Sequence, residues 1–352
     1  MAYSFLLYGS YGYTGGLIAD LAKQRGLNPL LAGRNADRLK AQAESLNLEY
    51  RVFDLNNTAV LLTALADTRL VLHCAGPFQR TFRQMAQACL QTHAHYLDIT
   101  GEVSVFEGLA AMDSAARSAG VMLLPGVGFD VVPSDCLSVH LKQRLPSATH
   151  LRIAIRTFAR GSSHGTALTM VAGLALPGAV RQAGKLVPLP LGEKTWLVDF
   201  GSGPVQAMSV PWGDVSTAFH STGIPNIETY LAVPALLRAA ARSSRPFRPL
   251  LRSRLVQQLL EKIVKAGPAG PSEQARIEGR SLFYAEAWEA ASQHISARLE
   301  TPEAYQLTAQ TALGVVEKVL QGEVHPGFQT PAKAYGADFI LEFEGVSRED
   351  LI

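Results

Sequence analysis

Three glycines close to the start of the chain have the spacing of a phosphate-binding turn. Gly9, Gly12 and Gly15 follow the apolar residues 5–8 and precede a helical apolar pattern at residues 17–22. Gly9 allows a tight turn, Gly12 lets the backbone approach a pyrophosphate, and Gly15 lets the helix pack closely on the strand. The helix would offer N–H groups and a partial positive charge to the phosphates. The predicted contacts of this dinucleotide-binding turn are Gly9, Ser10, Tyr11, Gly12, Tyr13, Thr14 and Gly15.

The end of the second predicted strand selects between two forms of the cofactor. Arg34 and Asn35 follow the apolar residues 29–32, and no acid occurs before Asp37. An NAD enzyme usually places Asp or Glu here for the ribose hydroxyl, whereas an NADP enzyme places Arg near the 2'-phosphate. The guanidinium of Arg34 suits a phosphate because it donates charge-assisted, planar hydrogen bonds. NADP is therefore the predicted cofactor, the alternative for Arg34 being an ordinary surface arginine.

Two further strand ends contribute predicted cofactor contacts. Asp54 and Leu55 follow the third strand, and Asp54 either accepts from the adenine amino group or caps the helix that begins near residue 57. The fourth strand, residues 69–74, lies beside the first in a doubly wound sheet, where ligands bind. Small residues at its end would admit the nicotinamide ribose, and Phe78 would either wall the ring or pack in the core. These predicted contacts are Ala75, Gly76, Pro77 and Phe78.

Six strand–helix units position these residues. Strands are predicted at residues 5–8, 29–32, 49–53, 69–74, 95–99 and 121–124, and helices include residues 36–46 and 81–92. Alternating strands and helices with glycine-rich strand ends are typical of an α/β fold with a doubly wound parallel sheet. We therefore expect an NAD(P)-binding Rossmann domain over residues 1–132.

The composition indicates what kind of protein this is. The 352 residues are 47% hydrophobic and 18% charged, with a net charge of +2, which indicates a folded chain and gives no sign of nucleic-acid binding. Cys74, Cys89 and Cys136 have neither close pairing nor metal spacing, so they are expected to be small apolar residues in a reducing compartment. With no signal-peptide pattern before the first strand and no apolar run suited to a membrane span, we expect a soluble cytoplasmic protein.

The motifs resemble a known family. YGSYGYTGG, LAGRNADRL, HCAGPF, HYLDITGE and PGVGFDVVPSD, in this order, are similar to the saccharopine dehydrogenase-like oxidoreductases, and nearest to the trans-acting enoyl reductase branch. The later segments SSHGTALTM, AGPSEQARIEGRS and GFQTPAKAYGADF resemble the same branch. The resemblance implies an NADP-binding domain, a second α+β domain built on a mixed sheet, and a homodimer. It also implies a phosphate-loop role for residues 9–15 and a 2'-phosphate role for Arg34.

The second domain is expected at residues 133–302. Strands are predicted at residues 149–159, 196–200, 206–211, 226–230 and 292–299, and an apolar helix at residues 165–180 that packs on the sheet or lines a pocket. A helix is predicted at residues 303–320 and a last strand at residues 336–343. This tail, residues 303–352, could return to the first domain.

Candidates for proton transfer lie at strand ends or just beyond them. They are Asp98, Glu102, Asp130 and His164, of which Asp130 could instead serve the end of the following helix and His164 could be structural. None of the ten tyrosines has Lys four residues later, which excludes the Tyr-x-x-x-Lys pair of short-chain reductases. No metal site is predicted.

Residues 236–265 form a basic segment, with eight Arg or Lys and one acid, Glu261. Basic amphipathic segments can lie on anionic membranes, but a solvated helical face is the favoured interpretation.

Two functions fit the sequence. The first is an NADPH-dependent reductase of a small apolar, acyl or imine-type molecule. The second is an NADP-binding regulatory or scaffold protein in which the cofactor is structural.

Overall fold

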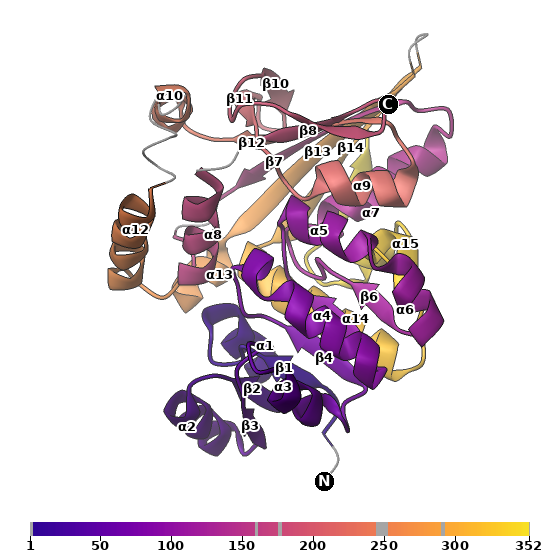
Figure 1. The fold of residues 1–352 in the computed structure, drawn as a ribbon. Coiled ribbons are helices and arrows are strands. Elements are labelled where there is room, and N and C mark those ends of the chain that lie inside the picture. Colours follow the sequence, from indigo (N-terminus) through magenta and orange to yellow (C-terminus); the bar gives the residue numbers. More distant parts are fainter. Residues whose placement is uncertain (1–2, 159–160, 175–177, 244–252, 290–292, 352) are drawn as a thin grey trace. The chain divides into compact units, whose positions relative to one another are not determined.

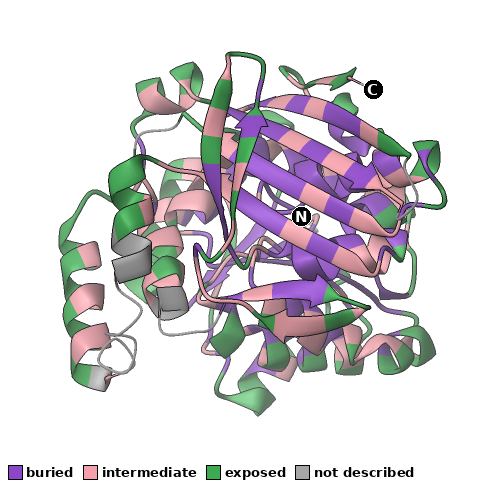
Figure 2. Ribbon diagram, turned by 90° about the horizontal axis from the view of Figure 1, so that it is seen from above, coloured by how far each residue is buried: buried purple, intermediate pink, exposed green. Residues whose placement is uncertain are grey.

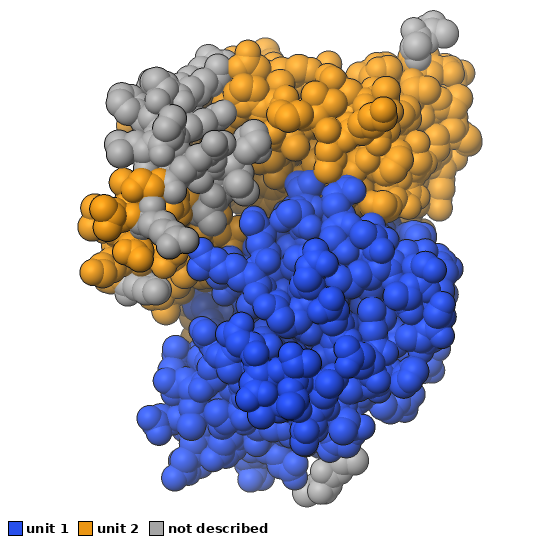
Figure 3. Space-filling view, viewed as in Figure 1, with its two compact units in different colours: residues 1–129, 305–334 blue, residues 130–304, 335–352 orange. Residues whose placement is uncertain are grey.

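The computed structural model describes residues 3–158, 161–174, 178–243, 253–289 and 293–351. Contacts divide the chain into two compact units (Figure 3). Unit 1 comprises residues 1–129 and 305–334, and unit 2 comprises residues 130–304 and 335–352. The C-terminal segment thus contributes residues 305–334 to unit 1 and then returns to unit 2.

Unit 1 is built on a seven-stranded parallel sheet in the order β15-β6-β5-β4-β1-β2-β3 (Figure 1). The strands are β1 (Leu6–Tyr8), β2 (Leu30–Gly33), β3 (Tyr50–Val52), β4 (Leu70–His73), β5 (His95–Asp98), β6 (Met122–Leu124) and β15 (Gly327–Phe328). The connecting helices are α1 (Tyr13–Gln24), α2 (Ala36–Leu46), α3 (Thr58–Leu65), α4 (Phe82–Thr92), α5 (Val103–Ala110) and α6 (Asp113–Ala119), and α14 (Ala304–Leu320) precedes β15. Because β1 pairs with both β2 and β4, the strand order reverses there, as predicted.

Local signals explain the bounds of α2. The side chain of Asn35 accepts a hydrogen bond from the N–H of Arg38, which caps the start of the helix. Asn47 adopts a left-handed conformation with φ 51° just past its end. Both are sequence signals, and the observed helix has the predicted limits.

Unit 2 contains a mixed sheet in the order β10-β11-β12-β7-β13-β14-β16, with the β8–β9 hairpin attached to β12. Its strands are β7 (His150–Thr157), β8 (Ala179–Gln182), β9 (Lys185–Pro188), β10 (Thr195–Asp199), β11 (Pro204–Ser209), β12 (Asn226–Ala232), β13 (Arg280–Trp288), β14 (His294–Pro302) and β16 (Ser347–Asp350). Its helices are α7 (Val132–Arg144), α8 (His164–Leu174), α9 (Asp214–Thr222), α10 (Ala235–Ser243), α12 (Arg254–Ala266) and α13 (Glu273–Glu278), while α15 (Pro331–Tyr335) spans the boundary between the units. Buried and less buried residues alternate along the central strands (Figure 2). The predicted fold class, a parallel Rossmann sheet with a second mixed-sheet domain, is confirmed.

Two predicted elements of unit 2 were wrong, and one central strand was not predicted. The helix expected at residues 165–180 ends at Leu174; Ala179 and Val180 begin the strand β8, and residues 175–177 lie outside the described residues. Residues 336–343 contain a 3-10 helix, Phe339–Glu342, because Phe339 and Ile340 are consecutive and both buried, which a strand facing one core does not allow. Strand β13 was not predicted, although it pairs with both β7 and β14.

No helix among the described residues is both long and apolar enough to cross a membrane.

Helices α7 and α9 pack together and bury two carboxyl groups. Asp135 in α7 accepts a hydrogen bond from Ser221 in α9, and Asp214 is the first residue of α9. Both side chains are fully buried. Burial, with the charges of Asp135 and Asp130, raises the pKa of Asp214 to about 8, although the nearby Ser134 hydroxyl opposes the shift.

The raised pKa of Asp214 predicts how stability depends on pH. The folded protein retains a proton on Asp214 between about pH 4 and pH 8 that the unfolded chain has lost, so stability falls as pH rises through this window. Asp214→Asn, which mimics the protonated group, should remove a slope on the order of 1 kcal/mol per pH unit. Urea unfolding at pH 5, 6, 7 and 8 measures it, with exposed Asp37→Asn as the control. Parallel slopes in the wild type and Asp214→Asn would contradict the assignment.

Candidate active site: the strand ends of unit 1

The turn after β1 is held by a very close approach of helix α1. Gly9 has φ +84°, and a Cβ atom there would lie 3.0 Å from Ala75 at the end of β4. A Cβ atom on Gly15 would lie 2.3 Å from the carbonyl oxygen of Gly9, which no real side chain tolerates. Gly12, which precedes α1, provides no side-chain cap, and no acid lies in the first turn. The backbone at the start of α1 is therefore presented without a side chain in the way, as pyrophosphate binding requires.

The remaining predicted residues of the turn have distinct surroundings. Ser10 is buried, and its hydroxyl donates to the side chain of Gln42 in α2 at 2.8 Å, so it braces the turn. The Tyr13 ring lies edge-on to Tyr305 of α14 at 5.0 Å. Thr14 is half-buried in the first turn of α1.

Tyr11 connects the turn to the end of β2. Its hydroxyl accepts hydrogen bonds from the backbone N–H groups of Arg34 and Asn35 at 3.1 and 3.3 Å. Its ring fills the space beside Gly33, where a Cβ atom would lie 2.5 Å from the ring. The guanidinium of Arg38 lies 4.8 Å from the centre of the ring and donates to the Tyr11 carbonyl oxygen. Tyr11 therefore positions the loop that carries the predicted 2'-phosphate residue.

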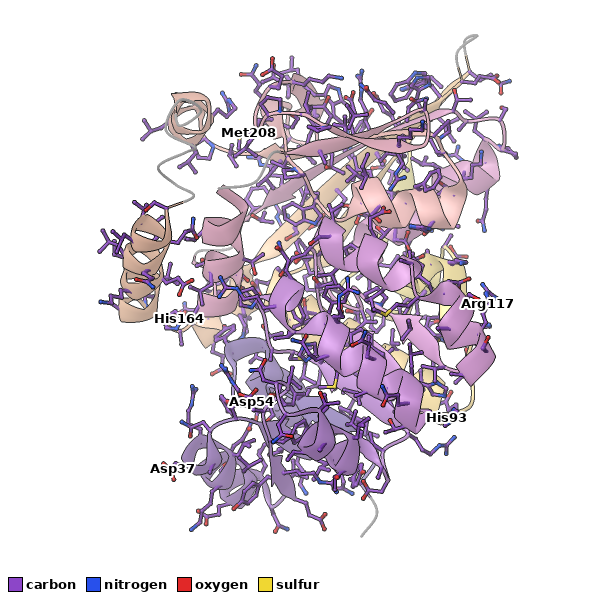
Figure 4. All side chains as sticks on the ribbon, viewed as in Figure 1. Asp37, Asp54, His93, Arg117, His164 and Met208 are labelled. Atoms are coloured by element: carbon purple, nitrogen blue, oxygen red, sulfur yellow. The ribbon has the colours of Figure 1, made fainter. Side chains whose placement is uncertain are left out.

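Two basic side chains lie at this end of the sheet. The Arg34 side chain is 70% exposed, and its guanidinium lies 4.0 Å from the Asp54 carboxylate, at the limit of an ion pair. Asp54 lies just past β3 (Figure 4). Arg38, four residues after Arg34, was not predicted; its spacing from Arg34 is the signal that could have found it. Asn35 uses its side-chain oxygen to cap α2.

Of the two roles considered for Asp54, helix capping is wrong. Asn57 caps α3 by accepting from the N–H of Val60, whereas Asp54 accepts from the backbone and side-chain nitrogens of Asn56. Leu55 is buried, at 5% exposure. The adenine role of Asp54 stays a prediction.

The end of β4 is fixed by a carboxylate from the loop that follows the neighbouring strand β5. The two oxygens of Glu102 accept hydrogen bonds from the backbone N–H groups of Phe78 and Gln79, at 2.8 and 3.0 Å. Burial raises the pKa of Glu102, and these two N–H groups oppose the shift by stabilising the carboxylate. The Glu102 side chain thus fixes the loop after β4, which comprises Ala75, Gly76, Pro77 and Phe78. Glu102 therefore lies at the predicted nicotinamide site as a positioning residue.

A buried, neutral histidine also supports the loop after β4. His73 in β4 is fully buried, and burial lowers its pKa to about 3. Its Nε2 lies 2.9 Å from the hydroxyl of Thr81, which donates to the carbonyl oxygen of Ala75. The ring of Phe78 packs edge-on to His73 at 5.4 Å and is 8% exposed. Phe78 thus packs in the core, which is one of the two roles predicted for it, the other being to wall the nicotinamide ring.

Asp98 ties the end of β5 to the end of β6. One oxygen accepts from the Tyr96 hydroxyl at 2.6 Å, and the other accepts from the N–H groups of Thr100 and Gly126. Burial raises its pKa to about 6, although these hydrogen bonds oppose the shift. Because both oxygens are used within unit 1, the structure indicates a positioning role for Asp98.

The other two proton-transfer candidates belong to unit 2. The Asp130 carbonyl oxygen accepts from the indole of Trp212 at 2.8 Å. The ring of His164, at the start of α8 (Figure 4), has its Nε2 2.9 Å from the carbonyl oxygen of Gly267. His164 thus connects α8 to the loop that follows α12.

Residues 161–165 have the GxSxG spacing that hydrolases place between a strand and a helix. Ser163 is 4% exposed, and its hydroxyl oxygen accepts from the N–H of Thr166 in the first turn of α8. Its backbone φ is not positive, unlike that of Gly161. Ser163 therefore caps the helix and does not have the exposed, strained position of a nucleophile.

A cleft of about 410 Å³ lies within unit 2. Apolar side chains such as Phe158, Val205 and Ala232 line it, together with Arg156 and Arg238. Arg156 donates to the Ser202 hydroxyl, and Arg238 donates to the backbone carbonyl oxygens of Gln206 and Val233. The cleft combines apolar walls with positive charge.

The parallel sheet, the glycine turn and the strand ends around the β1–β4 switch define unit 1 as a dinucleotide-binding domain. The comparisons agree. Residues 5–124 match the family model described as the saccharopine dehydrogenase NADP binding domain. The chain is therefore similar to this family over residues 5–124, in agreement with the resemblance seen in the sequence and with the predicted NADP-binding domain.

Comparisons with individual proteins cover different shares of the chain. The trans-acting enoyl reductase of Mycobacterium ulcerans is 26% identical over 202 residues, which cover 53% of this chain and 48% of that protein. The saccharopine dehydrogenase-like oxidoreductase of Mus musculus is 27% identical over 153 residues, covering 38% and 36%. The chain thus matches half or less of the length of these relatives. Saccharopine dehydrogenase (L-Glu forming) from Saccharomyces cerevisiae has a TM-score of 0.68 at 11% identity over 99% of both chains, which shows the shared fold.

Adjacent glycines in α1 provide a matched test of the turn. Gly15→Ala should weaken NADPH binding more than tenfold, because its Cβ would lie 2.3 Å from the Gly9 carbonyl oxygen. Gly16→Ala should bind NADPH normally and unfold at equal or higher urea, because its Cβ would lie 3.9 Å from the nearest atom and alanine favours a helix by about 1 kcal/mol. Titration of NADPH fluorescence and urea unfolding give both values. Equal behaviour of the two variants would contradict the packing argument.

Proposed function

We propose that this protein is an NADP(H)-dependent oxidoreductase that transfers hydride between the nicotinamide and a small apolar, acyl or imine-type substrate. The observation that carries the proposal is the turn of Gly9, Gly12 and Gly15, whose side-chain-free backbone at the start of α1 suits a pyrophosphate. The match of residues 5–124 to an NADP-binding domain supports it. The relatives named above as reductase and oxidoreductase support the reaction class.

The 2'-phosphate would bind at the end of β2. Arg34 is largely exposed and lies at the limit of an ion pair with Asp54, and the guanidinium of Arg38 lies over the Tyr11 ring. Two guanidinium groups provide the planar, charge-assisted donors that a phosphate monoester needs. The start of α2 adds a favourable partial charge. We therefore propose that Arg34 and Arg38 together give the preference for NADP over NAD.

The nicotinamide would lie at the end of β4, and the bound cofactor supplies the hydride. The loop of Ala75, Gly76 and Pro77 would position it, held in turn by Glu102. Asp98 and Glu102 accept structural hydrogen bonds at both oxygens, and the Nε2 of His164 is used by Gly267. Asp130, which follows the glycine-rich residues after β6, is the proposed proton handler on its position in the sequence. The cleft of Arg156 and Arg238 is a candidate position for a negatively charged group on an apolar substrate.

Charge reversal at the end of β2 tests the cofactor preference. Arg34→Asp and Arg38→Ala should each raise the Kd for NADPH at least tenfold and change that for NADH less than threefold, because NADH lacks the 2'-phosphate and charge-assisted bonds contribute about 1.5–3 kcal/mol. Lys40→Ala, also on exposed α2, is the control and should change neither. Equal losses for the two cofactors would reject the 2'-phosphate assignment.

A regulatory or scaffold protein with a structural cofactor is the alternative, and turnover separates the two. Stopped-flow absorbance should show oxidation of bound NADPH by at least one member of a panel of enoyl, imine and keto compounds. Asp130→Asn should lower the rate at least a hundredfold while the Kd for NADPH stays unchanged. Tight retention of NADPH without oxidation by any compound would favour the alternative.

A further inference from the structure

Helix α12 exposes a continuous apolar stripe to solvent. Leu255, Leu259 and Ile263 are four residues apart, so they share one face of the helix. They are 78%, 59% and 60% exposed. Large apolar side chains are individually common on surfaces, but a contiguous stripe marks an interaction site.

The stripe is separate from the face that holds α12 in the fold. Helix α12 packs beside α8 (Figure 1), and Gln257 donates to the carbonyl oxygen of Val171 at 3.3 Å. Val256, Leu260 and Val264 are half-buried. Because α12 has a packed apolar face and a second, exposed one, the exposed stripe is not needed to hold α12 against α8.

Helix α10 also exposes large apolar side chains. Leu236 is 80% exposed and Leu237 is 55% exposed. Arg238 folds back onto the carbonyl oxygens of Val233 and Gln206, which anchors the helix start and leaves both leucines facing solvent.

The charge of the segment identifies the kind of partner. Residues 236–265 carry eight Arg or Lys and one acid, whereas the whole chain has a net charge of only +2. A second copy of the chain docking through the same segment would bring like charges together. An anionic lipid surface complements both features, since it accepts apolar side chains below its phosphates and attracts basic residues by about 1 kcal/mol each.

We infer that α10 and α12 dock this protein onto anionic lipid surfaces, with Leu236, Leu237, Leu255, Leu259 and Ile263 inserted among the lipids. The helices would lie in the plane of the interface. The inference uses no residue of the cofactor site, and Arg238 of α10 is the one residue of the segment that also lines the cleft.

Flotation with vesicles tests the inference on the full chain with bound NADPH. Vesicles of equal parts phosphatidylglycerol and phosphatidylcholine should bind the protein at least tenfold more tightly than pure phosphatidylcholine, and 0.5 M NaCl should weaken the binding. Leu255→Gln/Leu259→Gln/Ile263→Gln should reduce binding at least tenfold, because it removes the inserted apolar surface. Leu197→Gln, 65% exposed on β10, is the apolar control and should bind like the wild type.

Two charge-reversal variants test the electrostatic part of the binding. Lys262→Glu should weaken vesicle binding, while Lys185→Glu, exposed on β9, should not. Unchanged NADPH affinity confirms that each variant is folded. The inference is overturned if the wild type ignores anionic vesicles or if the triple variant binds them normally. It is also overturned if light scattering shows that the triple variant only converts a dimer to a monomer, or if only an acidic protein partner binds the stripe.

Discussion

The contact between Gly15 and the carbonyl oxygen of Gly9 sets the geometry of the cofactor site. A Cβ atom at position 15 would be 2.3 Å from that oxygen, so helix α1 can approach the turn only because glycine is there. Gly9 in turn lies against Ala75 at the end of β4. One close contact therefore places three features together: the start of a helix, the end of β1 and the end of β4. The phosphate and nicotinamide positions depend on this spacing.

Buried carboxylates hold the neighbouring strand ends at the same edge. Glu102 accepts two backbone N–H groups from the loop after β4, and Asp98 accepts one each from the loops after β5 and β6. Burial disfavours their charged forms, and the hydrogen bonds offset this penalty. Such side chains are effective at orienting loops and poorly suited to exchanging protons with a substrate. Acids at strand ends can thus serve the site without taking part in the chemistry.

This distinction explains which features were predictable from sequence. The glycine turn and the limits of α2 depend on residues near one another in the chain, and both were predicted. The roles of Asp98 and Glu102 depend on which strands are neighbours in the sheet, which spacing along the chain does not reveal. The two-residue strand β15 and the charged edge strand β16 lack an apolar alternation. The central strand β13 has such an alternation, with Phe283, Ala285 and Ala287 buried, so that signal was available.

The same reasoning explains why the cofactor is easier to predict from the sequence than the substrate. A pyrophosphate is bound largely by backbone, and glycine spacing within seven residues encodes that backbone. The cleft of unit 2 is assembled from side chains, with Arg156 at the end of β7 and Arg238 in α10, 82 positions later in the chain. Their convergence depends on the pairing of β7 with β12 and of β12 with β11. A cleft of this kind is a property of tertiary structure, which spacing along the chain does not reveal.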